Sequence, residues 1–147
     1  MDLGVGGAWP SDAPADDAAL QASAMILLDT SAVLFLLAGH RRARPLSAYA
    51  GRLRFTPVAL LEMQFLKEVG RGVFTTDRPA DAVAEDPRWI VDDPPLSSVI
   101  RHALELTWTR DPFDRLIAAH AVYRGWRLAT SDGAMVDHLP AHLTLTL

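Results

Sequence analysis

A chain of 147 residues, 50% of them hydrophobic and 22% charged, is long enough for one globular domain with a sizeable core and too short for two. It contains no cysteine, which excludes disulfides, thiolate nucleophiles and cysteine-rich zinc sites, and no apolar run approaches the roughly 20 residues of a membrane span. The formal net charge of −4 arises in the first 24 residues, which hold four acids and no Lys or Arg, so the remainder is neutral.

Residues 1–24 form a segment rich in Gly, Ala, Pro, Ser and Asp, and this composition predicts a disordered or weakly ordered tail. We therefore expect the domain to occupy residues 25–147. Met25 directly precedes a strand-like run, so translation could begin at Met1 or at Met25. The tail lacks the basic start and apolar centre of a signal peptide, which favours a cytoplasmic protein.

Apolar patterns and breaker residues predict strands that alternate with helices along the rest of the chain. The first half is expected to hold a strand at 25–29, a helix at 30–38, a short helix at 45–50, a strand at 54–56 and a helix at 58–69. The second half is expected to hold a strand at 89–91, helices at 96–106 and 112–124, and strands at 127–130 and 143–147. This alternation predicts an α/β fold with a parallel sheet covered on both faces.

The helix ends carry the clearest local signals. Gly39 and Gly125 are expected to stop the helices that precede them. Pro57 suits a first helical position with Thr56 as its cap, and the Asp111-Pro112 pair opens the most distinct helix of the chain.

Four acidic residues fall where the ends of these elements should meet. Asp29 and Asp132 follow two predicted strands, and ligands of an open parallel sheet bind beyond the carboxyl ends of its strands. Glu62 and Asp114 lie early in two helices that begin near the same rim if the crossovers are right-handed. The sequence therefore predicts one acidic pocket.

Such a pocket needs a cation, because clustered carboxylates repel one another and raise their own pKa values. Ligands that are all oxygen select hard ions, Mg²⁺ or Mn²⁺, which leave positions free for phosphate oxygens. The implied chemistry is metal-dependent hydrolysis of a phosphodiester.

Each acid also has an ordinary structural explanation. Asp29 would be explained by capping the helix that follows it, Glu62 by an exposed position on its helix, and Asp132 by a turn with Gly133. For Asp111 the cap and the helix dipole are the better explanation, whereas for Asp114, beside apolar residues of its helix, a ligand role is favoured.

A basic segment without acids lies between Thr30 and Leu61. It contains Arg41, Arg42, Arg44, Arg52 and Arg54. These residues could contact the backbone of a nucleic acid, and an arginine-rich solvated surface is an equally weighted interpretation.

Four short segments, LLDTSAV at 27–33, TPVALLE at 56–62, RDPFDRLIAA at 110–119 and LATSD at 128–132, together resemble a PIN domain of the VapC-type toxin group. The resemblance implies a three-layer α/β/α fold and a Mg²⁺- or Mn²⁺-dependent endoribonuclease. A cognate antitoxin and a second copy of the chain are the protein partners expected with it.

The resemblance also implies roles for individual residues. By position, the family's acidic quartet corresponds to Asp29, Glu62, Asp114 and Asp132. Asp111 is an extra acid that would reach the metal through water. Supporting hydroxyls are matched by Thr30, Ser31 and Thr130, although Ser31 also has a capping explanation. The acidic tail and the short link between Gly39 and Phe55 depart from the family pattern, which bears on antitoxin binding and substrate access.

Other protein classes fit less well. A receiver domain needs a lysine near its last strand, and the only lysine here is Lys67, within a much earlier helix. A haloacid-dehalogenase-like phosphatase needs a second Asp two positions after the first, where Ser31 stands. The remaining alternative is a PIN-like protein that binds RNA or an antitoxin with little or no cleavage. No base-reading motif is visible, so the RNA target stays open.

Overall fold

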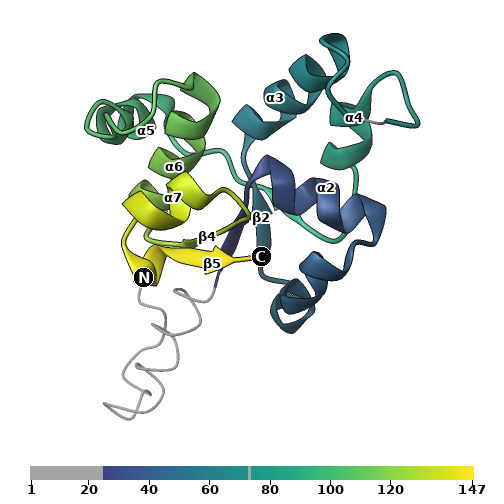
Figure 1. Cartoon of the computed structure of the whole chain (residues 1–147), viewed down its shortest axis with the longest axis horizontal. Coiled ribbons are helices and arrows are strands. Elements are labelled where there is room, and N and C mark those ends of the chain that lie inside the picture. Colours follow the sequence, from purple (N-terminus) through teal and green to yellow (C-terminus); the bar gives the residue numbers. More distant parts are fainter. Residues whose placement is uncertain (1–24, 73) are drawn as a thin grey trace, which may run out of the picture.

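The computed structural model describes residues 25–72 and 74–147 (Figure 1), and the predicted tail at 1–24 lies outside them. At its centre is a five-stranded sheet with the order β3-β2-β1-β4-β5. All its strands are parallel. They are β1 (Ile26–Leu28), β2 (Leu53–Phe55), β3 (Ile90–Val91), β4 (Arg127–Thr130) and β5 (Thr144–Thr146).

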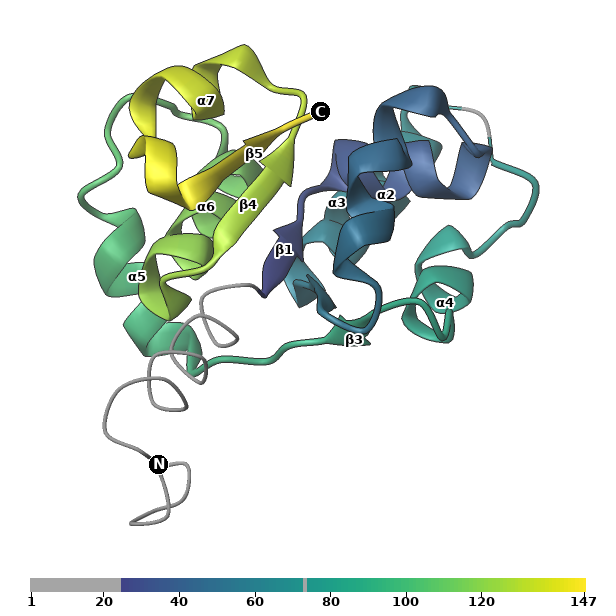
Figure 2. The same cartoon turned by 90° about the horizontal axis from the view of Figure 1, so that it is seen from below.

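Helices cover both faces of this sheet. Those between β1 and β3 are α2 (Thr30–Ala38), the 3-10 helix η2 (Arg41–Tyr49), α3 (Pro57–Glu68) and α4 (Pro79–Ala84). Those after β3 are α5 (Leu96–Ala103), α6 (Pro112–Arg124), α7 (Gly133–His138) and the 3-10 turn η3 (Ala141–Leu143). The chain first moves outward from β1 to β3 and then returns to β4, so right-handed crossovers place the two groups on opposite faces. Figure 2 shows this arrangement, with α5, α6 and α7 on one side of the strands and α2, α3 and α4 on the other.

The central strands have the burial that a sheet covered on both faces requires. Ile26, Leu27 and Leu28 of β1 are completely buried, as are Leu128 and Ala129 of β4. Strand β1 therefore is a continuous apolar run in the sequence, and the two central residues of β4 are apolar as well. The predicted three-layer α/β/α fold is confirmed. None of the helices in the described part of the chain has the length and apolar character of a membrane span.

The helix ends follow the local signals. Gly39 and Gly125 end α2 and α6 in the left-handed conformation, with φ of 63° and 69°. The Thr56 side chain accepts a hydrogen bond from the Val58 amide and Pro57 occupies the first turn of α3. Because Thr56 serves as a cap, β2 ends at Phe55, one residue earlier than predicted.

Four other elements differ from the prediction. The short helix expected at 45–50 is a 3-10 helix that begins at Arg41, since Pro45 lies inside it and lacks the N–H of an α-helical ladder. The short helices α4 and α7 were not predicted, because six residues are too few to display a helical period. Helix α5 ends at Ala103, three residues before the expected end.

Candidate metal centre

The carboxyl end of β1 places Asp29 at the floor of the candidate site. Its side chain is 4% exposed. Its Oδ1 accepts hydrogen bonds from the Ala32 amide at 2.8 Å and from the Ser31 hydroxyl at 2.7 Å. Asp29 thus caps α2, as its structural explanation proposed, but the cap does not account for a buried carboxylate that also lines a pocket.

The carboxyl end of β4 supplies the adjoining wall. The Thr130 hydroxyl accepts a hydrogen bond from the Asp132 amide at 2.9 Å, and Asp132 Oδ1 accepts one from the Ala134 amide at 2.8 Å. Asp132 therefore caps α7 and does not sit in an isolated turn. The Ser131 amide donates to the Ser31 hydroxyl at 3.3 Å, so Ser31 joins the ends of β1 and β4.

Helices α3 and α6 bring the remaining acids to the same place. Glu62 Oε1 accepts a hydrogen bond from the Thr30 hydroxyl, which holds the α3 carboxylate against the start of α2. Asp111 caps α6, because its Oδ1 accepts from the amides of Phe113 and Asp114 at 2.8 and 3.2 Å.

Three of the acids converge closely enough to share one ion. Glu62, Asp111 and Asp114 each offer an oxygen, and these oxygens lie within 4.8 Å of one another, the only such group in the described ranges. Beside them is a pocket of about 210 Å³ whose polar lining is Asp29, Thr30, Ser31, Glu62, Asp114 and Asp132. The four predicted acids therefore lie around a single pocket. Asp111 lies close to Glu62 and Asp114 and also caps α6.

The electrostatics of the pocket are unfavourable in the absence of a cation. Burial raises the pKa of Asp114 to about 7, and the negative charges of Asp111 and Glu62 contribute to the increase. Burial also raises the pKa of Glu62 and of Asp29 above their ordinary values, against the opposing effect of their hydrogen bonds. None of the described residues that line the pocket is basic. An all-oxygen donor set with uncompensated charge fits a hard divalent ion.

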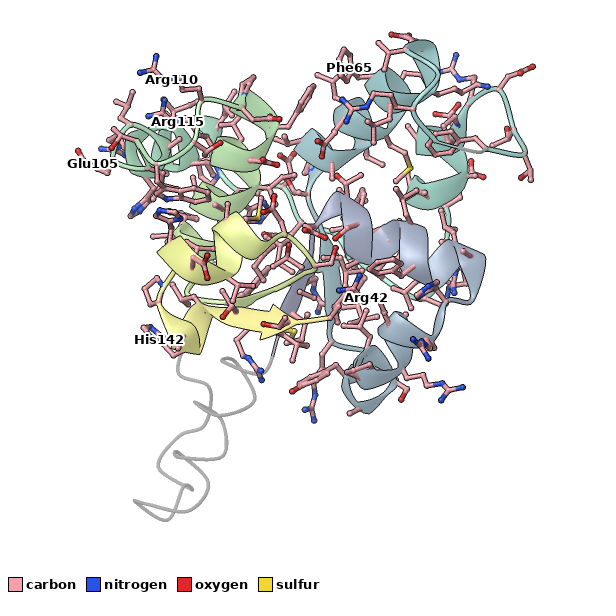
Figure 3. The ribbon with its side chains drawn as sticks, viewed as in Figure 1. Arg42, Phe65, Glu105, Arg110, Arg115 and His142 are labelled. Carbon is pink, nitrogen blue, oxygen red and sulfur yellow. The ribbon has the colours of Figure 1, made fainter. Side chains whose placement is uncertain are left out.

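The basic segment is partly engaged within the protein. Arg41, Arg42 and Arg44 lie in η2 and are exposed. Arg42 Nη2 donates to the carbonyl of Leu147, just beyond β5, at 2.8 Å (Figure 3). Arg54 Nη1 donates to the carbonyl of Leu53 at 3.0 Å.

A second polar cluster, at the end of β3, was not anticipated from the sequence. His120 is 1% exposed on α6, and its Nε2 lies 2.7 Å from Asp92 Oδ2. Arg124 Nε donates to the same Asp92 oxygen at 2.8 Å. No local sequence pattern links Asp92 to residues 28 and 32 positions away.

Comparison with known proteins gives a consistent result. A family model described as the PIN domain matches residues 26–138. A toxin-antitoxin complex from Klebsiella pneumoniae is similar in structure, with 16% identity, a TM-score of 0.61, and coverage of 82% of this chain and 96% of that one. DNA-bound VapBC from Salmonella typhimurium is also similar, with 18% identity, a TM-score of 0.59, and coverage of 83% and 97%. At sequence identities of 16% and 18%, these two structural similarities show only that the fold is shared. No curated protein matches the sequence significantly.

Proposed function

The chain belongs to the PIN-domain family, and on that premise we propose that it is a Mg²⁺- or Mn²⁺-dependent endoribonuclease, the toxin of a toxin–antitoxin pair. The proposal rests on the convergence of the Glu62, Asp111 and Asp114 carboxylates. Two of them, Glu62 and Asp114, line one pocket together with Asp29 and Asp132. Buried structural carboxylates are normally paired with basic side chains. The carboxylates of this pocket have no basic residue beside them among the described residues that line it.

Under this proposal Asp29, Glu62, Asp114 and Asp132 hold the ion, and Asp111 completes the site through a water molecule. When bound, the ion supplies Lewis-acid stabilisation of the charge that develops during phosphodiester hydrolysis. The chain contributes a pocket in which the carboxylates are already assembled and oriented, so the ion meets preformed ligands.

The hydroxyl residues act by positioning these ligands. Thr30 fixes the Glu62 carboxylate, and Ser31 fixes Asp29 while it joins β1 to β4. Thr130 holds the backbone of Asp132. Outer hydrogen bonds of this kind usually change metal affinity or activity by about 10- to 100-fold when they are removed.

The partners follow from the same proposal. RNA is the substrate, and the exposed arginines of the basic segment are proposed to contact its backbone. An antitoxin is proposed as the inhibiting partner, since the solved structures that share the fold include toxin–antitoxin complexes. The homodimer stays a prediction, and the molar mass of the purified chain in solution tests it.

Metal-dependent cleavage of RNA by the purified chain tests the function. Cleavage should require Mg²⁺ or Mn²⁺, stop with EDTA and be lost in Asp114→Asn. The rival, a PIN-like protein that only binds RNA or its antitoxin, predicts RNA binding without any metal-dependent product. A preparation that binds Mn²⁺ and yet leaves every RNA intact would favour that rival.

A further inference from the structure

Two phenylalanines meet beside the candidate metal centre. Phe65 of α3 and Phe113 of α6 have ring centroids 5.7 Å apart, with their planes inclined by 35°. No other aromatic contact within the described ranges joins these two helices. The pair therefore bridges the two elements that supply Glu62 and Asp114.

Both rings are fixed close to the carboxylates by the backbone. Phe65 follows Glu62 by three residues, so the two side chains emerge from nearly the same side of α3, about 4.5 Å apart along its axis. Phe113 directly precedes Asp114, and its amide donates to the Asp111 carboxylate at 2.8 Å. The aromatic pair thus lies within the reach of one nucleotide from the acidic cluster.

The contact between the rings leaves aromatic surface open to solvent. Phe65 is 42% exposed although it touches Phe113, which is half-buried. Exposing a large apolar side chain forgoes the free energy that its burial would supply. What sets Phe65 apart from other exposed apolar residues is that its ring, paired with Phe113, lies beside the acidic pocket.

We propose that Phe65 and Phe113 form a stacking platform for one unpaired base of the RNA substrate. The inference rests on the proposed function. An aromatic ring accepts any base on its face, whereas the bases of a duplex are already stacked within the helix and cannot reach it.

The position of the rings favours a base as their occupant during cleavage. A protein that covered Phe65 and Phe113 would lie over the acidic cluster and close it to RNA, so the rings must be accessible whenever cleavage occurs. The two arginines nearest to Phe113 in the sequence, Arg110 and Arg115, do not provide a charged contact for a ligand at these rings. Arg115 Nε donates to the carbonyl of Ala103 in α5, and Figure 3 shows Arg110 and Arg115 on the α5 side of the molecule while Phe65 lies on α3.

The test compares Phe65→Leu and Phe113→Leu, which keep apolar bulk but remove the aromatic face, with Phe65→Tyr, which restores it. Leu104→Ala is the matched control, because Leu104, directly after α5, is a 65% exposed apolar residue. The probe is a short mixed-sequence RNA, single-stranded or annealed to its complement, bound by the full chain with Ca²⁺ in place of Mn²⁺. A second set of probes carries 2-aminopurine at successive positions, and steady-state cleavage is measured with Mn²⁺.

We expect both Leu variants to lose at least about five-fold in affinity for the single strand, the fold-change of a weak base–aromatic stack. Their KM should rise by a similar factor with kcat little changed. The parent, Phe65→Tyr and Leu104→Ala should bind alike, and duplex RNA should bind weakly to all of them. One 2-aminopurine position should lose fluorescence on binding to the parent and not on binding to Phe65→Leu.

Two results would overturn the platform. One is unchanged single-strand affinity and fluorescence in both Leu variants. The other is a change in solution mass with no change in RNA affinity, which would assign the rings to a protein interface. Failure of the proposed function looks different, because the parent itself would then show no Mn²⁺-dependent cleavage whatever its stacking behaviour.

Discussion

Two groups of buried or half-buried polar side chains lie at carboxyl ends of strands in this protein, and they have opposite electrostatics. At the end of β3, hydrogen bonds from Arg124 and His120 outweigh the burial of Asp92 and lower the pKa of that carboxyl. At the ends of β1 and β4, burial and neighbouring acids raise the pKa of Asp114 to about 7.

The difference separates a structural cluster from a binding site. Asp92 receives both of its hydrogen-bond partners, His120 and the positively charged Arg124, from α6, so the cluster is complete within the chain and ties β3 to that helix. The carboxylates around Asp114 have no cation of the chain among the lining residues that the structure describes, and they remain costly until an external cation binds. Substitutions in the two clusters should therefore have opposite effects on stability and activity.

The largest effect is expected for Asp114→Asn and for Asp29→Asn, which remove a charged ligand. Each should reduce RNA cleavage by more than about 100-fold, beyond the usual effect of losing an outer hydrogen bond. Each should leave the metal-free protein as stable as the parent or slightly more stable, because a repulsion is relieved. Mn²⁺ should raise the melting temperature of the parent and raise that of the variants far less. Normal cleavage by both variants would refute the metal-nuclease proposal.

Asp92→Ala should behave in the opposite way. Removing the acceptor leaves buried His120 and the Arg124 guanidinium without their partner, at a cost of about 1.5–3 kcal/mol for hydrogen bonds to a charged group. The melting temperature should fall by several degrees. The Mn²⁺-dependent increase in melting temperature and the cleavage by the folded protein should persist. Loss of the Mn²⁺ effect would mean that the two clusters are coupled through α6.

The pH dependence of stability sharpens the same contrast. The pKa of Asp114 is about 7 in the folded protein and 3.8 ordinarily. Between these values the folded state keeps a proton that the unfolded state has released, so this residue makes stability fall as pH rises from about 4 to 7. The pKa of Asp92 is lowered instead, so its contribution is present above the ordinary pKa and is lost on acidification. Melts of metal-free parent and Asp114→Asn from pH 5 to 8 should show the steeper decline in the parent; parallel curves would contradict the assignment.

A smaller loss of activity, within about ten-fold, is expected for Asp111→Asn. Asn caps a helix nearly as well as Asp, so α6 should keep its position and its melting temperature. The direct ligands of the proposed site remain. Side-by-side cleavage assays with Asp114→Asn measure the contrast. An inactive Asp111→Asn beside an active Asp114→Asn would show that the two acids have been assigned the wrong way round.

The exposed arginines of η2 can be compared with the acidic pocket, because they carry uncompensated positive charge where the pocket carries negative charge. Arg41 and Arg44 are the two exposed η2 arginines whose guanidinium groups make no hydrogen bond or ion pair within the described ranges. If they contact the RNA backbone, replacing both with Ala should weaken binding modestly and flatten its logarithmic salt dependence by about one unit of slope per lost contact. Binding isotherms at several salt concentrations measure this, and an unchanged slope would exclude these residues from the interface.

Much of the fold and of the candidate site was predictable because the signals are local. The apolar residues of β1 and β4, the Gly39 and Gly125 stops and the Thr56-Pro57 start each depend on a few neighbouring residues. The acidic quartet followed from strand ends and the handedness of crossovers, which act on any parallel α/β sheet.

Only the tertiary structure decided which distant side chains meet. It brought carboxylate oxygens of Asp111 and Glu62 within 4.8 Å of each other. It also paired Asp92 with His120 and packed Phe65 against Phe113. These contacts depend on how α3 and α6 are rotated and packed over the sheet. That rotation is set by the whole core, since close-packed side chains from many elements must fit together at once, and no short segment of the sequence contains the information.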